Sequence, residues 1–210
     1  MSDPAELYDA ILNGNAKKAE EVTRAALEAK ADPVELVQKH MIPAMDEVGR
    51  RFECNEYFVP ELLIAARAMK TALELITPHL VAAGAEPAGR VVIGTVQGDL
   101  HDIGKNLVAS MLEGGGFQVI DLGVDVAPEK FVEVAREKHG TIVALSALLT
   151  TTMTMMKRVI EALEQAGVRE QTKVIIGGAP ITQQYCDQIG ADGYSDNANA
   201  AVALARRLVG

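Results

Sequence analysis

The chain has 210 residues and a formal net charge of -9 at pH 7. This length provides enough apolar material for one large or two modest domains. The acidic excess argues against nucleic acid or an anionic membrane as the main partner, because both are negatively charged. No apolar run approaches membrane-spanning length and no signal peptide opens the chain, so we expect a cytoplasmic protein. Cys54 and Cys186 belong to no metal-binding motif and are expected to be reduced, structural thiols.

Residues 1–82 are predicted to form a bundle of four or five helices. Asn15 and Asp32 are typical helix N-caps, and Pro43 predicts a kink or a restart. A long final helix is expected to begin at Pro60. The residues just before it, Tyr57 and Phe58, are two of the few aromatic residues in the chain. Aromatic side chains in cores and in ligand pockets look alike in sequence, so both interpretations stay open.

Residues 83–90 are small and rich in glycine and proline, which is typical of an interdomain linker. Strand and helix patterns then alternate through residues 91–210. This alternation predicts a doubly wound, flavodoxin-like (Rossmann-like) α/β domain with a five-stranded parallel sheet. The strands are expected at residues 91–96, 117–122, 141–146, 173–177 and 192–194. Helices are expected from about residue 105 to the glycines at 114–116, and at 128–138, 152–165, 180–189 and 198–208.

The loop after the first strand, residues 98–104, has the sequence GDLHDIG. Ligands of open parallel sheets bind at the carboxyl ends of the strands, so His101 is a candidate ligand residue. Asp99 can hold one ring N–H of His101 and leave the other nitrogen as a lone-pair donor. Gly98 and Gly104 leave room for a large flat ligand. An isolated loop histidine is more often merely solvated, so this motif does not decide alone.

Two further groups of residues are expected at the same edge of the sheet. Ser146 and Thr150 lie at and just past the end of the third strand, where their hydroxyls can bind a buried polar tail of a ligand. They can equally be turn or N-cap hydroxyls. Gly177 and Gly178 end the fourth strand, where they either admit a ligand or simply make a turn.

These motifs resemble, in order and position, the signature of cobalamin-binding proteins of the methionine synthase type. They are Asp-x-His-x-x-Gly after a strand, Ser-x-Leu at residues 146–148 and the glycine pair at 177–178. The resemblance spans nearly the whole chain, bundle included. It implies a cobalamin or related corrinoid bound base-off, with its nucleotide tail displaced and His101 as the lower cobalt ligand. The cofactor-binding residues that it implies are Gly98, Asp99, His101, Asp102, Ile103, Gly104, Ser146, Leu148, Thr150, Gly177, Gly178 and Phe58.

The resemblance also assigns roles to individual side chains. His101, Asp99 and Thr152 are implied to act together, with Thr152 hydrogen-bonded to the aspartate at a position where the family commonly has serine. The helical domain is implied to cap the upper face of the corrin, with Phe58 rather than Tyr57 or Leu62 as the main contact. The cap is expected to move as a rigid body through the linker. The sequence departs from the family at residues 179–180, where Ala-Pro replaces the frequent Ala-Thr.

The function implied by the resemblance is that of a corrinoid methyl carrier. Such a protein accepts a methyl group from a substrate-specific methyltransferase onto cobalt(I). It passes the group from methyl-cobalt(III) to a second methyltransferase, whose acceptor is tetrahydrofolate or a thiol such as coenzyme M. A reductive activase is the third expected partner. The methyl donor stays open among methanol, methylamines, glycine betaine and methoxylated aromatics.

The chain has no room for donor, acceptor or activation domains, so we expect a subunit of a methyltransferase system and not a complete enzyme. Two alternatives are a cobalamin-binding sensor or regulatory module, which would carry a basic helix-turn-helix, and the cobalamin subunit of a mutase, which would lack a cap. A flavodoxin-like nucleotide binder would need phosphate-binding residues that loop 97–104 does not supply.

Overall fold

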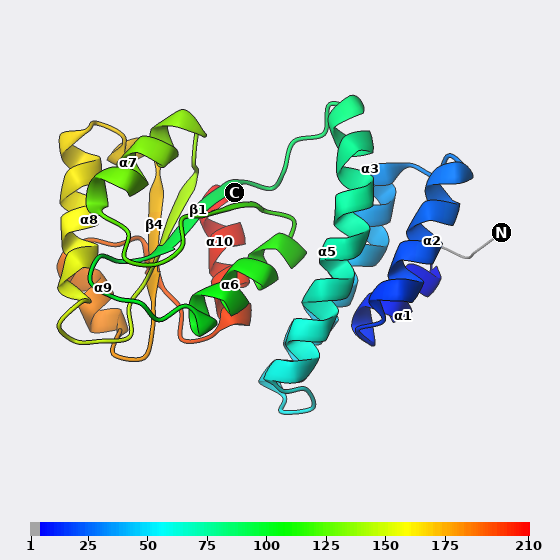
Figure 1. The fold of residues 1–210 in the computed structure, drawn as a ribbon, viewed down its shortest axis with the longest axis horizontal. Helices are drawn as coiled ribbons and strands as arrows, with labels where there is room; N and C mark the ends of the chain where they lie inside the picture. The colour runs from blue at the N-terminus through cyan, green and yellow to red at the C-terminus, as the bar shows by residue number, and fades with distance from the viewer. Residues whose placement is uncertain (1–4) are drawn as a thin grey trace. The chain divides into compact units, whose positions relative to one another are not determined.

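The computed structural model describes residues 5–210, so the first four residues of the predicted bundle lie outside it. The chain divides into two compact units. One runs to Pro87 and includes Glu113–Gly116, and the other comprises Ala88–Leu112 and Phe117–Gly210. The first is built of helices and the second of alternating strands and helices (Figure 1).

The helical unit begins its helices where the sequence predicts N-caps. The Asn15 side chain accepts a hydrogen bond from the Lys18 N–H at 3.0 Å, and Asp32 accepts one from the Val34 N–H at 2.8 Å. These bonds satisfy donors that the first turn of a helix leaves without partners. The elements of this unit are α1 (Ala5–Leu12), α2 (Ala16–Glu28), α3 (Pro33–Leu36), a π-helical turn (Val37–Met41), α4 (Ile42–Glu53) and α5 (Val59–Ala82).

The expected kink or restart at Pro43 takes the form of the π-helical turn. A proline has no N–H to donate, and its ring collides with the carbonyl four residues earlier in an α-helix. That carbonyl belongs to Lys39, which lies within the wider turn. The chain therefore passes from α3 into α4 without leaving helical geometry.

The second unit has a sheet of five parallel strands in the order β2-β1-β3-β4-β5, which confirms the predicted doubly wound fold. Helices α7, α8 and α9 cover one face of the sheet, and α6 and α10 cover the other (Figure 1). The strands are β1 (Arg90–Thr95), β2 (Gln118–Asp121), β3 (Ile142–Ser146), β4 (Lys173–Gly177) and β5 (Gly193–Tyr194). The helices are α6 (Ile103–Gly114), α7 (Pro128–Glu137), α8 (Thr154–Gln165), α9 (Gln183–Ile189) and α10 (Ala198–Val209), with a 3-10 turn at Arg169–Gln171.

The strand register brings the ends of three neighbouring strands to one edge. Thr95 of β1 pairs with Ser146 of β3, and Ser146 pairs with Gly177 of β4. The order of the strands reverses at β1, because the chain goes from β1 outward to β2 and then returns to β3 on the other side. A crevice opens at such a reversal, and ligands of this fold class bind there. The loops after β1 and β3 both leave from this point.

Two helices start later than the sequence predicts, at Thr154 instead of 152 and at Gln183 instead of 180. The Thr152 hydroxyl is hydrogen-bonded to Asp99, so residue 152 belongs to the loop after β3. Thr182 is the N-cap of α9 and accepts a hydrogen bond from the Tyr185 N–H at 3.2 Å. None of the helices between residues 5 and 210 is long and apolar enough to cross a membrane.

Candidate cofactor-binding site

Asp99 is the buried centre of the site. Its Oδ1 accepts hydrogen bonds from the His101 ring Nδ1 at 2.7 Å and from the His101 backbone N–H at 3.1 Å. Its Oδ2 accepts hydrogen bonds from the Thr152 hydroxyl at 2.7 Å and from the Leu148 N–H at 2.8 Å. Burial by itself would raise the pKa of Asp99, but the bonds from Thr152, Leu148 and His101 outweigh it and hold this pKa well below its usual range. Asp99 is therefore an anion that ties the loop after β1 to the loop after β3.

The His101 ring is fixed on one side and open on the other. An ionised carboxylate can only accept hydrogen bonds, so Nδ1 of the ring carries a proton toward Asp99. In the tautomer with its proton on Nδ1, the ring has its lone pair on Nε2, and the imidazole is 52% exposed. The His101 backbone is held as well, because its carbonyl accepts a hydrogen bond from the Thr95 hydroxyl at 2.8 Å.

This single histidine is not part of a larger metal-ligand cluster. Among the described residues, no group of three or more His, Cys, Asp or Glu side chains is placed to hold a metal ion. A bare ion such as zinc needs three or four protein ligands. The site instead fits a metal that arrives with most of its ligands attached, as cobalt does in a corrin ring.

Exposed apolar residues flank the histidine in its own loop and occur in the loop bonded to Asp99. Leu100 is 71% exposed and Ile103 is 83% exposed, on either side of His101, and Leu148 of the facing loop is also exposed. Large apolar side chains gathered on a surface are typical of a binding site. Their position beside an outward imidazole fits a large ligand with an apolar face.

The four predicted glycines differ in whether the rest of the protein requires a glycine at that position. A Cβ added to Gly104 would meet no protein atom within 4 Å, so the rest of the protein does not require a glycine there. Gly98 has a φ of +83°, which a side chain rarely adopts. Gly178 has a φ of +129°, and a Cβ there would lie 1.9 Å from the Ala147 carbonyl oxygen. Gly177 is less constrained, with the Ser195 carbonyl oxygen 3.2 Å from an added Cβ.

The remaining predicted residues lie around the same edge, but side-chain bonds do not join them to the Asp99 cluster. Ser146 is half-buried at the end of β3, and Thr150 is exposed in the loop that follows. Asp102 is exposed beside the histidine and accepts a hydrogen bond from the Asn106 side chain at 3.1 Å.

Sequence reasoning missed three charged residues near this loop. Lys105 is buried at the start of α6, where its ammonium group bonds to the Asp121 carboxylate. Asp125 accepts a hydrogen bond from the Gly98 N–H at 2.7 Å. Asp121 is the last residue of β2 and Asp125 follows that strand, whose carboxyl end reaches the same edge of the sheet. That placement is the signal that could have revealed them.

Phe58 lies in the helical unit. It precedes α5 as its N-cap, is 60% exposed, and its backbone N–H donates to the Glu61 carboxylate at 2.9 Å. Leu62 is fully buried in the bundle. The Tyr57 hydroxyl donates to the Leu12 carbonyl at 3.3 Å and accepts from the Arg51 guanidinium at 3.0 Å. Of the three predicted contacts of the cap, Phe58 is the one whose side chain faces solvent.

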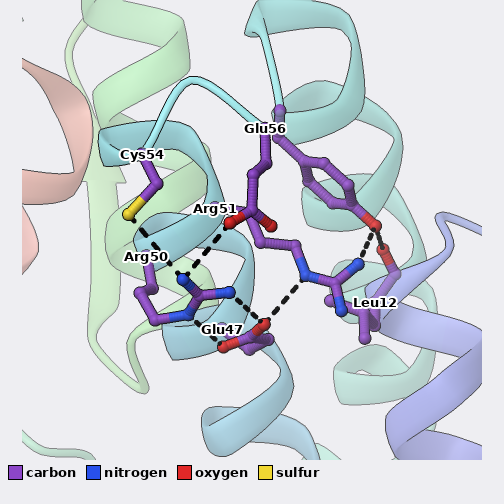
Figure 2. Close-up of polar contacts among 7 residues, drawn as sticks. Leu12, Glu47, Arg50, Arg51, Cys54 and Glu56 are labelled. Atoms are coloured by element: carbon purple, nitrogen blue, oxygen red, sulfur yellow. Dashed lines mark hydrogen bonds and ion pairs between the residues drawn. The ribbon is translucent and has the colours of Figure 1, made fainter.

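A polar cluster holds the turn that carries Phe58 (Figure 2). The Glu47 carboxylate accepts hydrogen bonds from Arg50 at 2.7 Å and from Arg51 at 2.8 Å. These bonds, that from Arg50 first, lower the pKa of Glu47 to about 2. Arg50 also pairs with Glu56 at 3.5 Å and donates to the exposed Cys54 sulfur at 3.7 Å. The turn between α4 and α5 is therefore linked to α4 at several points.

Comparison with known proteins gives matches over nearly the whole chain. B12 binding domain families match residues 89–203 and residues 5–77. Trimethylamine corrinoid protein 1 of Methanosarcina acetivorans is 46% identical over 98% of this chain and 96% of its own length. The crystal structure of a cobalamin-binding protein from Desulfitobacterium hafniense is 36% identical, with a TM-score of 0.80 and full coverage of both chains. A chain of the methanol:cobalamin methyltransferase complex MtaBC from Methanosarcina barkeri is 30% identical, with a TM-score of 0.86, and the match covers 97% of this chain and 78% of that one.

Proposed function

This chain belongs to the B12-binding family of corrinoid proteins, and on that premise we propose that it is a corrinoid methyl carrier of a multi-component methyltransferase system. The observation that carries the proposal is the His101 imidazole, fixed at Nδ1 by a buried anionic aspartate and open at Nε2. When bound, a corrinoid supplies a cobalt centre that takes up and releases a methyl group. The protein supplies the groups that hold and shield that centre.

His101 is proposed as the lower cobalt ligand of a base-off corrinoid. Its orientation is set before any ligand arrives, because Asp99 holds the ring and the backbone N–H of the same residue. A carboxylate behind a ligating histidine raises the basicity of the ligand nitrogen. The Thr152 hydroxyl and the Leu148 N–H also donate to Asp99, so the carboxylate that holds the imidazole is itself fixed in place.

The remaining predicted residues are proposed to bind the rest of the cofactor. Gly98, Gly104, Asp102, Ile103 and Leu148 border the imidazole, where they would contact the lower face of the ring. A second set, at the ends of β3 and β4, is proposed to line the slot for the displaced nucleotide tail; it consists of Ser146, Thr150, Gly177 and Gly178. Phe58 is proposed to cover the upper face, and its 60% exposure supports that role.

The proposed partners are a substrate:corrinoid methyltransferase, a methylcorrinoid:acceptor methyltransferase and a reductive activase. The name of the Methanosarcina acetivorans relative, trimethylamine corrinoid protein 1, supports a methylamine as the methyl donor. The likeness to a chain of the methanol:cobalamin methyltransferase complex MtaBC supports pairing with a donor methyltransferase.

The central test is the visible spectrum of the protein reconstituted with hydroxocobalamin. We expect imidazole ligation to cobalt in the wild type and its loss in His101→Ala, with an affinity at least about tenfold lower. His79→Ala in α5 is the matched control, because it removes an exposed histidine at a helical position where alanine is favoured. An unchanged spectrum in His101→Ala, or no corrinoid uptake by the wild type, would contradict the proposal.

A further inference from the structure

Asp125 has a backbone conformation that ordinary side chains avoid. Four residues other than glycine have a positive φ in the described part of the chain: Lys30, Asn55, Asp125 and His139. Three of them directly follow the C-cap of a helix, where a left-handed residue commonly ends the helix. Asp125, with a φ of +54°, follows no helix and lies between β2 and α7. Its conformation therefore needs another reason.

That reason lies in its contacts with the histidine loop. The Asp125 carboxylate accepts a hydrogen bond from the Gly98 N–H at 2.7 Å, and its own N–H donates to the Asp99 carbonyl at 3.0 Å. These two bonds hold the backbone on either side of the Asp99 side chain. A residue with φ below zero could not aim its N–H and its carboxylate in the same way, and unusual backbone conformations persist where surrounding contacts fix them.

Residues before and after Asp125 are hydrogen-bonded to Thr95, the last residue of β1. The Thr95 N–H donates to the Gly123 carbonyl at 3.0 Å, and the Val126 N–H donates to the Thr95 carbonyl at 3.0 Å. Val96 and Val126 form a parallel β-bridge. The segment 123–126 thus runs beside the end of β1 like a short extra strand, and Asp125 is its point of contact with the loop.

We infer that Asp125 is a positioning residue for the metal ligand, acting on His101 through Asp99. It fixes the backbone from which the Asp99 side chain projects, and Asp99 in turn fixes the imidazole. Aspartate suits the position because it tolerates a left-handed conformation and its short carboxylate makes a charge-assisted bond to a backbone N–H. The inference rests on the proposed role of His101 as cobalt ligand.

Three substitutions of Asp125 separate the effect of its carboxylate from the effect of its backbone conformation. Asp125→Asn keeps an acceptor oxygen and is expected to bind hydroxocobalamin with histidine ligation within about threefold of the wild type. Asp125→Gly keeps the left-handed conformation without strain and removes the acceptor, so it folds but binds about tenfold more weakly. Asp125→Ala removes the acceptor and strains the backbone, so it is expected to be weaker still. Amide exchange at Gly98 in the cofactor-free protein is expected to rise in Asp125→Gly and not in Asp125→Asn.

A double-mutant cycle with His101→Ala distinguishes positioning of the ligand from a general effect on the pocket. If Asp125 acts through the histidine, Asp125→Gly lowers corrinoid affinity in the wild type and has little effect in His101→Ala. An equal loss in both backgrounds, or no loss in either, overturns the inference while leaving His101 as the ligand. Failure of His101→Ala alone to change the spectrum would overturn the proposed function instead.

Discussion

The Thr152 hydroxyl is one of the hydrogen-bond donors that hold the buried Asp99 carboxylate at the centre of the site. Thr152 is buried, and its hydroxyl lies 2.7 Å from Asp99 Oδ2 and 3.0 Å from the Leu149 carbonyl oxygen. A hydroxyl has one proton, and the shorter bond goes to the charged acceptor. Threonine and serine share this group, so the threonine present here retains the bond that the resemblance implies for serine.

Thr152→Val is expected to destabilise the cofactor-free protein by about 2 kcal/mol, because it removes a donor from a buried anion while keeping the shape of the side chain. Thr152→Ser keeps the hydroxyl and is expected to cost less than about 1 kcal/mol. Urea unfolding of the two variants without corrinoid measures the difference. Equal losses would mean that the threonine methyl group, and not its hydroxyl, stabilises the loop.

At the scale of elements, two glycines near the site differ in whether the packing of the protein excludes a side chain. Gly104 lies in the first turn of α6, where a Cβ would point into open space, and Gly178 follows β4, where a Cβ would collide with the Ala147 carbonyl. The protein's own packing therefore explains Gly178 and does not explain Gly104. Gly104 is therefore the position where a substitution tests the proposed cofactor site without disturbing the packing of the protein.

Gly104→Ala is expected to leave the cofactor-free protein as stable as the wild type, or more stable by about 0.5 kcal/mol, since alanine favours helix. The same substitution is expected to weaken hydroxocobalamin binding, because the methyl group occupies space proposed for the ring. Gly178→Ala is expected to destabilise the cofactor-free protein by about 3 kcal/mol or more. Thermal unfolding and a corrinoid titration of both variants measure these effects. Unchanged corrinoid affinity in Gly104→Ala would separate residue 104 from the cofactor site.

The sequence predicts elements better than it predicts the contacts between their loops. β-branched runs such as residues 91–96 identify the buried strands because both faces of this sheet are covered by helices. Asp99 and His101 are recognisable because they lie two residues apart. The bond between Asp125 and Gly98 joins residues 27 positions apart, and no local pattern reports it. The late start of α8 has the same origin, since the Thr152 hydroxyl is hydrogen-bonded to Asp99, which lies in the loop after β1.

At the scale of the whole molecule, the bonds that fix the predicted cobalt ligand all lie in one unit. Gly98, Asp99 and His101 belong to Ala88–Leu112, and Asp125 and Thr152 belong to Phe117–Gly210. Of the four residues grouped with the helical unit, Glu113 and Gly114 end α6, at the far end of that helix from the histidine loop, and Gly115 and Gly116 follow it. We therefore propose that the boundary near residues 83–90 separates a cofactor-binding unit from a unit that covers the cofactor.

A fragment of residues 88–210 is expected to bind hydroxocobalamin with the same histidine ligation as the full chain, because it retains every partner of Asp99 and His101. It lacks Phe58, so cyanide is expected to replace the upper cobalt ligand faster in the fragment than in the full chain. Visible spectra and stopped-flow mixing with cyanide measure the two properties, and Phe58→Ala in the full chain shows how much of the shielding depends on that ring. If the fragment folds but binds no corrinoid, the helical unit contributes to the lower side of the site as well. If ligand exchange is equally fast in both proteins, the helical unit does not cover the cofactor in the resting protein.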